Sequence, residues 1–309
     1  MALNTREIKG RLRSIKNTQK ITHTMELVAA AKMRRAVTGA INSRTYSTLA
    51  WDLVQRLRQA VQFNDDDPRQ FWFDQSTSIT KQPHTTVLVF TSNRGLCGAF
   101  NNNVIKQTVK FLKTVPTEAV TIVCVGKKGA GTLSTLGYTV HQAYAKADSA
   151  RNDESIQELA EYVYEEFTQQ RTHRVVVAYT DYQSSISQTA VIRQLYPLTS
   201  QNTISQAVDN ADAAKPKITP PTKHAVYKYE PSAEAVLEYI VPRIAEVQLY
   251  QALLESNASE HSARMLAMKS ATDAAGDMSD ELVLAFNRAR QAAITKEIAE
   301  ISAGSAALS

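Results

Sequence analysis

One segment of this sequence, rich in glycine and lysine, has the residue types of a phosphate-binding loop. Gly126-Lys-Lys-Gly-Ala-Gly131 follows a β-branched apolar run and precedes a stretch of helical character. Backbone N–H groups at the start of a helix attract anions, so a phosphate could bind in such a position. The spacing is not that of GxxxxGK[ST], and no Ser or Thr is placed to bind magnesium after a Walker lysine. We interpret the segment as a tight turn after a strand and keep a phosphate-binding α/β enzyme as an alternative.

Other residue types that catalyse reactions are present but are not grouped. Six histidines are scattered without an HxxxH or HExxH spacing, and there is no GxSxG motif. Cys97 and Cys124 form no CxxC pair, so we expect buried, inert thiols. Asp65, Asp66 and Asp67 lie in a polar stretch typical of a solvated loop. The sequence therefore predicts no catalytic residue, no metal site and no cofactor.

A second glycine-containing segment remains a candidate binding site. Ser92–Asn101 directly follows an apolar run and precedes a helical pattern, and Gly95 and Gly98 permit backbone conformations that other residues resist. From the residues alone this is a strand-to-helix loop that could carry a site.

The middle of the chain has the pattern of a small α/β domain. Short β-branched runs predict buried strands at Thr86–Thr91, Val120–Val125 and Arg174–Tyr179. Helical periodicity separates them at Asn101–Lys113 and Ser155–Gln170, and Ile186–Pro197 could add an edge strand. The order β-α-β-α-β predicts a mostly parallel, Rossmann-like sheet over residues 85–200. Residues 61–84 and 201–231 are expected to be linkers or loops.

The two ends of the chain are predicted to be long helices, over residues 1–60 and 232–309. The N-terminal end carries an apolar stripe, with an imperfect register between Ile15 and Ile21: Ile8, Leu12, Ile15, Ile21, Met25 and Val28. The C-terminal end has an unbroken 4-3-4-3 seam in which many residues are small or polar: Leu254, Ala258, His261, Met265, Met268, Thr272, Ala275, Ser279, Leu282, Phe286, Ala289 and Ala293. Each apolar stripe needs a partner surface. We therefore expect the two helices to form an antiparallel coiled coil, with the α/β domain inserted in the sequence between them.

Charge is concentrated at the N-terminal end. The net charge is +5, but residues 1–44 hold ten Lys or Arg and only two acids, which leaves −3 on the rest of the chain. Such a segment favours an acidic partner, which could be a protein, a nucleic acid or a lipid surface. Residues 1–44 contain no aromatic side chain that could stack on bases, which argues against a coiled-coil tether for nucleic acid. No apolar run of 18 residues occurs, so we expect no insertion into a membrane.

Three segments together resemble the γ subunits of F-type ATP synthases. Ile15-Lys-Asn-Thr-Gln-Lys-Ile-Thr22 and Met25-Glu-Leu-Val-Ala-Ala-Ala-Lys-Met33 are similar to the N-terminal helix of that family, and Asn93-Arg-Gly-Leu-Cys-Gly98 to its loop in the α/β domain. Ala263-Arg-Met-Leu-Ala-Met-Lys-Ser-Ala-Thr-Asp273 and Asn287-Arg-Ala-Arg-Gln-Ala-Ala-Ile-Thr295 are similar to its C-terminal helix. Asn93 and Ala99 depart from the family's usual Asp and Gly, and no cysteine follows Cys124, so plastid-type thiol regulation is not expected.

The resemblance implies a non-catalytic rotor shaft, present in one copy per complex. Its partners would be the α and β subunits, the ε subunit and the ring of c subunits, and it would lie at the cytoplasmic face of a bacterial plasma membrane. It would couple proton flow to ATP synthesis by rotation. The residues implied to contact the α/β ring are Met25, Arg34, Arg35, Cys97, Arg290, Gln291 and Thr295. Those implied to face the c-ring or ε are Tyr227, Tyr229 and Glu230.

Overall fold

A computed structural model describes residues 5–61, 63, 67–73, 83–147, 154–198 and 227–308. The structure divides into two units: Met1–Ala30 with Arg264–Ser309 (unit 1), and Ala31–Ala263 (unit 2). The long helices α1 (Thr5–Ala60) and α5 (Ala233–Leu308) each contribute to both units. No helix within the described ranges is long and apolar enough to span a membrane.

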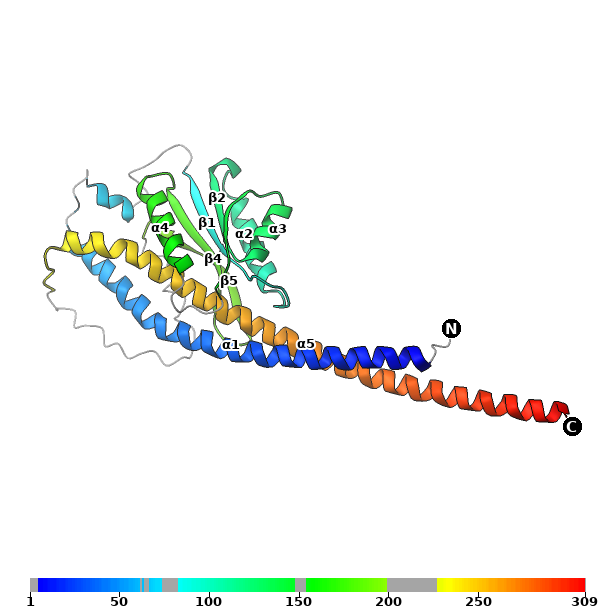
Figure 1. Cartoon of the computed structure of the whole chain (residues 1–309). Coiled ribbons are helices and arrows are strands. Elements are labelled where there is room, and N and C mark those ends of the chain that lie inside the picture. Colours follow the sequence, from blue (N-terminus) through cyan, green and yellow to red (C-terminus); the bar gives the residue numbers. More distant parts are fainter. Residues whose placement is uncertain are drawn as a thin grey trace. The chain divides into compact units, whose positions relative to one another are not determined.

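Unit 2 is built on a five-stranded sheet with the order β3-β2-β1-β4-β5 (Figure 1). The strands are β1 (Thr85–Phe90), β2 (Val120–Val125), β3 (Val140–Tyr144), β4 (Arg174–Tyr182) and β5 (Gln188–Tyr196). The first four pair in parallel, whereas β5 returns antiparallel to β4 through a short hairpin. The mostly parallel Rossmann-like domain is therefore confirmed, and the additional strand does lie at an edge.

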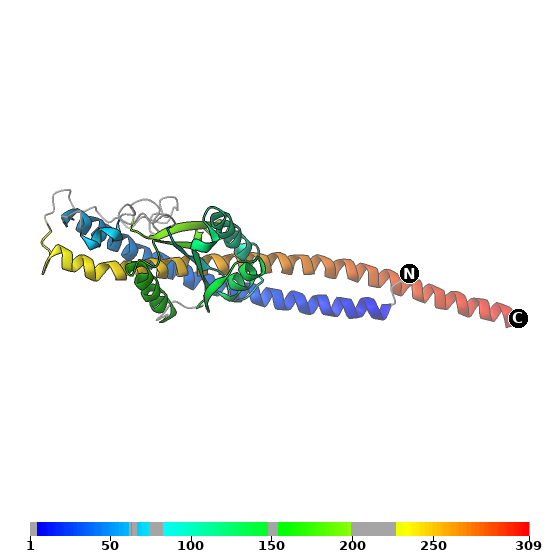
Figure 2. The ribbon, with the colours of Figure 1, turned by 90° about the horizontal axis from the view of Figure 1, so that it is seen from above.

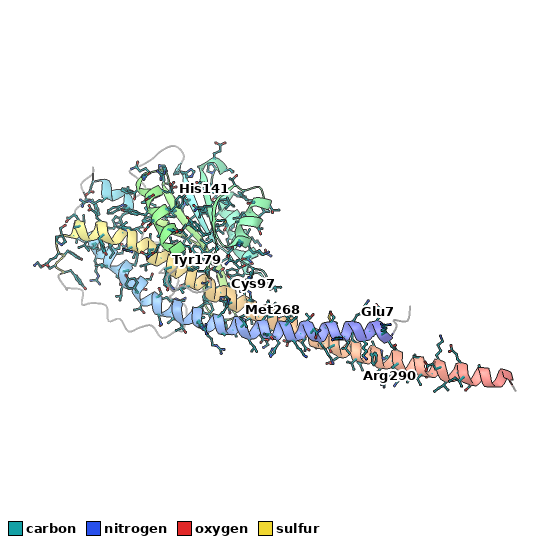
Figure 3. The ribbon with its side chains drawn as sticks, viewed as in Figure 1. Glu7, Cys97, His141, Tyr179, Met268 and Arg290 are labelled. Carbon is teal, nitrogen blue, oxygen red and sulfur yellow. The ribbon has the colours of Figure 1, made fainter. Side chains whose placement is uncertain are left out.

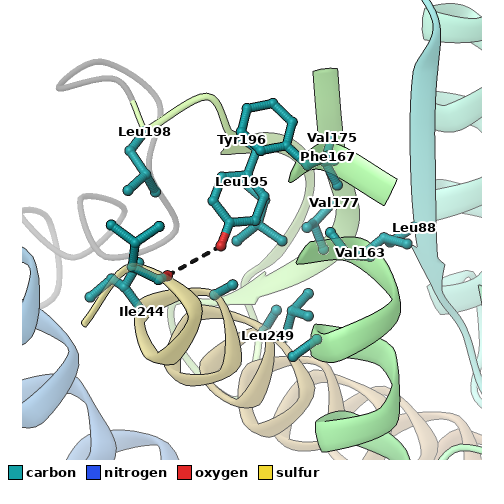
Figure 4. Close-up of a cluster of buried hydrophobic side chains, with 14 of the residues drawn as sticks. Leu88, Val163, Phe167, Val175, Val177, Leu195, Tyr196, Leu198, Ile244 and Leu249 are labelled. Carbon is teal, nitrogen blue, oxygen red and sulfur yellow. Dashed lines mark hydrogen bonds between the residues drawn. The ribbon is translucent and has the colours of Figure 1, made fainter. Parts of the chain in front are cut away.

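Helices cover both faces of the sheet, because alternate residues of each strand point to opposite sides. On one face, Val89 and Cys124 belong to a cluster with side chains of α2 (Phe100–Leu112) and α3 (Lys127–Thr135). On the other face, Leu88 and Val177 pack in a cluster with α4 (Glu154–Thr168) and with the unit 2 parts of α1 and α5 (Figures 2 and 4). The buried Tyr196 hydroxyl adds a 3.2 Å hydrogen bond to the Val241 carbonyl. These contacts fasten the sheet to the long helices.

The range expected to link the first helix to the sheet contains ordered structure. A short 3₁₀ helix, η1 (Pro68–Trp72), is capped by the Asp67 carboxylate, which also pairs with the Arg69 guanidinium at 2.7 Å. Trp72 and Phe73 are buried in the core of unit 2. Asp67 is therefore a capping residue, while Asp65 and Asp66 lie outside the described residues.

In unit 1, α1 and α5 run antiparallel and in close contact (Figures 1 and 2). The Thr272 hydroxyl is 2.8 Å from the Thr22 hydroxyl, and a Cβ placed on Gly276 would lie 3.1 Å from the amide nitrogen of Gln19. Residue numbers thus rise along one helix as they fall along the other. The glycine leaves room for the opposing side chain, which explains how a seam of small residues forms a narrow pair.

The apolar stripe predicted for α1 was wrong in its second half. Ile21 and Val28 are 60% and 52% exposed. The covered side instead continues the 4-3 spacing through polar residues: Ile8, Leu12, Ile15, Gln19, Thr22, Glu26 and Ala29. Polar residues occupy covered positions in this half of the helix, so the most apolar residues there do not mark the seam. The α5 seam is confirmed by the burial of Met268, Ala275 and Ser279, whereas Ala293 at its end is exposed.

One strand of unit 2, β3, was not predicted from the sequence, and one helix, α3, was expected only as a possibility. β3 is a sheet-edge strand with exposed His141, Gln142 and Ala143, so it lacks the apolar run of a buried strand. α3 contains two glycines, which weaken a helical pattern. The last helix, expected over residues 232–309, is α5 (Ala233–Leu308), and it contains Pro242.

Candidate interaction site

The interpretation of Gly126–Gly131 as a tight turn was wrong, because α3 begins at Lys127 directly after Gly126 and the segment packs against the end of β1. The Gly129 N–H donates to the Thr91 hydroxyl at 2.9 Å, and the Lys128 N–H donates to the Ser92 carbonyl at 3.0 Å. Gly126 has φ +112°, and a Cβ on it would collide with the Thr91 carbonyl. Because protein groups already accept hydrogen bonds from this helix start, the geometry gives no support to the phosphate-binding alternative.

The loop between β1 and α2 is held in a strained conformation. Leu96 adopts φ 62° although it is not glycine, and Gly98 follows with φ 56°. Leu96 is 61% exposed, whereas the Cys97 side chain is buried and accepts a hydrogen bond from the Asn101 amide at 3.3 Å (Figure 3). The loop therefore presents Leu96 outward and uses Cys97 to hold its shape.

Asn93 ties this loop to the segment that follows β3. Its amide nitrogen donates to the Lys146 carbonyl at 2.6 Å, and its amide oxygen accepts from the Lys146 N–H at 3.1 Å. A carboxylate could make only the second of these bonds, because it has no donor when ionised. Asparagine at this position is thus matched to a two-way backbone contact.

Lys146 carries the connection onward to α5. Its ammonium group is 2.9 Å from the Glu260 carboxylate and donates to the Ser256 hydroxyl at 2.9 Å. It also lies 5.2 Å from the centre of the Phe100 ring. Both charged side chains are almost completely buried. The loop, the segment after β3 and α5 are therefore joined by one continuous set of polar contacts.

The part of α5 that receives these contacts is a buried polar segment, Gln251–Ser262. Its Asn257 amide donates to the Ala147 carbonyl, its Ser259 hydroxyl to the Thr180 carbonyl and its Ser262 hydroxyl to the Ser185 carbonyl. On the α1 side, the Gln251 amide donates to the Ala40 carbonyl. The buried polar segment thus connects α5 to α1, to the end of β4 and to the β4–β5 hairpin.

A buried acid lies at the centre of the buried polar segment. Glu255 is 0% exposed, and its Oε1 accepts from the Gln251 amide at 2.7 Å and from the Arg44 Nε at 3.4 Å. Arg44 directs its Nη2 to the Tyr182 carbonyl at 3.0 Å instead. Burial, followed by the charge of nearby Asp181, raises the pKa of Glu255 to about 8. Burial also raises the pKa of Asp181, against the opposing effects of Glu255, Arg44 and Arg193.

The site residues suggested by the family resemblance fall on different parts of the structure. Met25 is partly buried beside the α1 seam of unit 1, and Arg34 and Arg35 are exposed on α1 in unit 2. Arg290, labelled in Figure 3, and also Gln291 and Thr295 are exposed along α5. Cys97 is the exception, since it is buried beneath its loop.

Residues 227–230, which precede α5, form a small aromatic and ionic group. The Tyr227 and Tyr229 rings stack with centres 6.5 Å apart, and the Arg56 guanidinium lies 5.0 Å over Tyr227. Glu230 pairs with Lys228 at 2.6 Å on the surface. Tyr227 is 45% exposed, so its outer face is open to a partner.

The polar contacts between α5 and the sheet were not foreseen from the sequence. They involve Arg44, Lys146, Asp181, Glu255 and Glu260. The one available signal was Glu255-Ser-Asn-Ala-Ser-Glu-His-Ser262, a stretch that is polar on several sides of the helix. Polar residues are ordinarily exposed, so the stretch alone did not indicate burial. The part of the chain that the structure describes contains no group of three or more His, Cys, Asp or Glu that could bind a metal ion.

Comparison with known proteins gives one consistent result. A family model described as "ATP synthase" matches residues 4–308. The ATP synthase gamma chain of Heliobacterium modesticaldum is 38% identical over 303 residues, which are 98% of this chain and 98% of that one. The ATP synthase gamma chain of Nitrosomonas eutropha is 37% identical and covers 99% of both chains.

Solved structures have the same fold. A chain of the Euglena gracilis mitochondrial ATP synthase, in a structure of OSCP, F1 and the c-ring, superposes with a TM-score of 0.64 at 20% identity, covering 98% of this chain and 94% of that one. A chain from the central stalk and c-ring of the Tetrahymena thermophila mitochondrial ATP synthase has a TM-score of 0.55 at 24% identity, covering 81% and 99%.

Proposed function

The chain belongs to the ATP synthase gamma chain family, and we propose that it is the rotor shaft of a proton-translocating F-type ATP synthase. The observation that carries this proposal is the match of the ATP synthase family model to residues 4–308, together with gamma chain relatives at 37–38% identity over nearly the whole chain. In functional terms we assign the shaft to residues 1–60 and 232–309 and the inserted domain to residues 85–200. As a gamma chain, it is a non-catalytic part of the enzyme complex.

The proposed partners are the α and β subunits, the ε subunit and the c-ring, with one copy of this chain in each complex. Rotation by the c-ring would turn the inserted domain, and the long helices would then turn inside the α/β ring. A shaft can drive catalysis only if it stabilises different β conformations at different angles, so its surface must be asymmetric. The basic α1 end, with exposed Ile21 and Val28, supplies such an asymmetric surface.

We propose that the α/β ring contacts the shaft at three places. The first is α1 at Met25, Arg34 and Arg35, where the basic side chains suit an acidic surface on β. The second is the Ser92–Asn101 loop, where the exposed Arg94 and Leu96 reach the partner and the buried Cys97 maintains the loop. The third is the exposed Arg290, Gln291 and Thr295 on α5.

A separate set of contacts, with the c-ring or the ε subunit, is proposed at Tyr227, Tyr229 and Glu230. The stacked tyrosines and the Arg56 guanidinium over Tyr227 preorganise an aromatic surface with one exposed face. Tyrosine favours interfaces because it has an apolar ring and a polar end. The chain is a peripheral subunit, and its similarity to bacterial gamma chains supports a place at the cytoplasmic face of the plasma membrane.

The direct test is purification of the tagged chain with α and β subunits expressed beside it. We expect a stable complex containing all three, with ATP hydrolysis coupled to proton pumping after addition to membranes that hold the proton-translocating sector. The isolated chain should hydrolyse no ATP. Failure to copurify with α and β, or ATP turnover by the isolated chain that Lys127→Ala abolishes, would overturn the proposal.

A further inference from the structure

Two buried acidic side chains lie where β4 joins α5: the Ser259 hydroxyl of α5 donates to the Thr180 carbonyl, and Arg44 contacts both Glu255 and the Tyr182 carbonyl, on either side of Asp181. Asp181 is the last but one residue of β4, and Glu255 lies in the buried polar segment of α5. Their exposed fractions are 4% and 0%. Burying an ionised carboxylate is costly unless charges or hydrogen bonds compensate for the lost water, and two ionised carboxylates side by side also repel each other.

The surrounding cations compensate for these acids only in part. From α1, the Arg44 guanidinium makes a single long contact of 3.4 Å with Glu255 and gives its Nη2 to a backbone carbonyl. From β5, the charge of Arg193 lowers the pKa of Asp181. The same guanidinium also lowers the pKa of the Tyr179 hydroxyl on β4, so it is shared between the two groups. From α5 itself, only the neutral Gln251 amide donates to Glu255. None of these contacts is the paired, two-point contact that an arginine makes with a fully ionised carboxylate.

We propose that Asp181 and Glu255 hold one proton between them at neutral pH and that this protonated pair keeps β4 attached to α5. The proton resides mainly on Glu255, the more deeply buried of the two. When it leaves, two negative charges face each other between the strand and the helix, and the attachment loosens. Asp181 and Glu255 are therefore positioning residues whose effect on the structure depends on pH.

The consequence for the complex rests on the proposed function. If the inserted domain transmits rotation to the shaft helices, the joint between β4 and α5 must be stiff. As the pH rises toward about 8, the pKa of Glu255, the joint would become more compliant, and above that pH it would stay so. The proposal concerns the fold of the chain itself, so it can be tested without any partner subunit.

The sign of the pH effect follows from proton binding. Glu255 ordinarily titrates at 4.5 and in the folded chain at about 8, so the folded chain binds the proton more tightly. Local opening of β4 should therefore become easier as the pH rises from 4.5 to 8, by up to about tenfold in the opening constant per pH unit. Above this range the contribution of Glu255 should no longer change.

The experiment uses the full chain and two spectroscopic measurements. Infrared spectroscopy at neutral pH should show the carbonyl band of a protonated carboxylic acid, which Glu255→Gln should remove. The matched control is Glu246→Gln, on the same helix, where the carboxylate contacts Arg243 at 2.9 Å near the surface; the band should persist. Hydrogen exchange of the β4 amides, corrected for intrinsic rates, should lose most of its dependence on pH in Glu255→Gln.

A second variant keeps the test decisive if Glu255→Gln folds poorly. Asp181→Asn removes the neighbouring negative charge, so the acid band should disappear at a lower pH than in the unmodified chain. The proposal is overturned if the unmodified chain shows no acid band at neutral pH, if Glu255→Gln retains the band, or if Asp181→Asn leaves its titration unchanged. Equal pH dependence of β4 exchange with and without Glu255→Gln would also overturn it. Copurification with α and β tests the proposed function separately.

Discussion

The Lys146 ammonium lies 2.9 Å from the Glu260 carboxylate, and both side chains are excluded from solvent. Lys146 follows β3 and is joined through its backbone to Asn93, so this ion pair connects the Ser92–Asn101 loop to α5. A proposed contact loop is thereby fixed to a helix of the shaft within unit 2.

Removal of one member of this pair should strongly destabilise unit 2. Lys146→Met removes the buried ammonium that lies 2.9 Å from the Glu260 carboxylate, at an expected cost of about 3–5 kcal/mol in the free energy of unfolding. The double variant Lys146→Met/Glu260→Leu should recover much of this loss, because it removes both charges. Urea denaturation measures both effects. Lys228→Met removes a cation from an exposed pair and serves as control, with little change expected; a loss no greater in Lys146→Met would contradict the prediction.

Two glycines of α3 should respond oppositely to alanine. A Cβ at Gly129 would lie 2.6 Å from the Thr91 hydroxyl, whereas a Cβ at Gly131 meets nothing within 4 Å. Gly129→Ala should therefore lower the thermal midpoint. Gly131→Ala should leave it unchanged or raise it, since alanine favours a helix interior by roughly 0.5–1 kcal/mol over glycine. Equal effects at the two positions would show that packing against Thr91 is not what requires Gly129.

The antiparallel register of unit 1 can be tested with one disulfide. The hydroxyls of Thr22 and Thr272 are 2.8 Å apart, so Thr22→Cys/Thr272→Cys should crosslink readily within a single chain under mild oxidation. Thr22→Cys/Met278→Cys is the control, because Met278 is 56% exposed and lies more than one turn further along α5. Native Cys97 and Cys124 are buried and free, so they should not compete. Efficient crosslinking of the control pair, or crosslinks only between chains, would exclude this register.

Met25→Lys should separate assembly from coupling in the complex. Met25 is only partly covered in unit 1, so lysine can extend into solvent without breaking the helix pair. A new ion pair with an acidic β surface would form at some angles only, worth about 1–2 kcal/mol, and would trap those states. We expect normal assembly with fewer protons pumped per ATP. Ala29→Lys is the contrasting variant, since Ala29 is 2% exposed and lysine there should reduce assembly itself. Full coupling in assembled Met25→Lys complexes would show that Met25 does not face β.

Local sequence pattern determined the architecture. Continuous β-branched runs are buried on both faces of a parallel sheet, so β1, β2 and the start of β4 were predicted within a residue or two. The unbroken 4-3 spacing from Leu254 onward predicted the α5 seam for a similar reason, because one side of a helix recurs with that period. The motifs of the terminal helices and the Asn93–Gly98 segment were sufficient to indicate the family.

Only the tertiary structure decided which polar residues are buried. Gln19 and Thr22 lie on the covered side of α1 while Ile21 is exposed, because small residues of α5 let polar side chains pack in the seam. Glu255 and Glu260 are both glutamates and lie five residues apart on α5. Lys146 stabilises the charge of one, whereas burial beside Asp181 favours the proton on the other. The sequence cannot distinguish them, since the charge of a carboxyl group depends on neighbours that are far away along the chain.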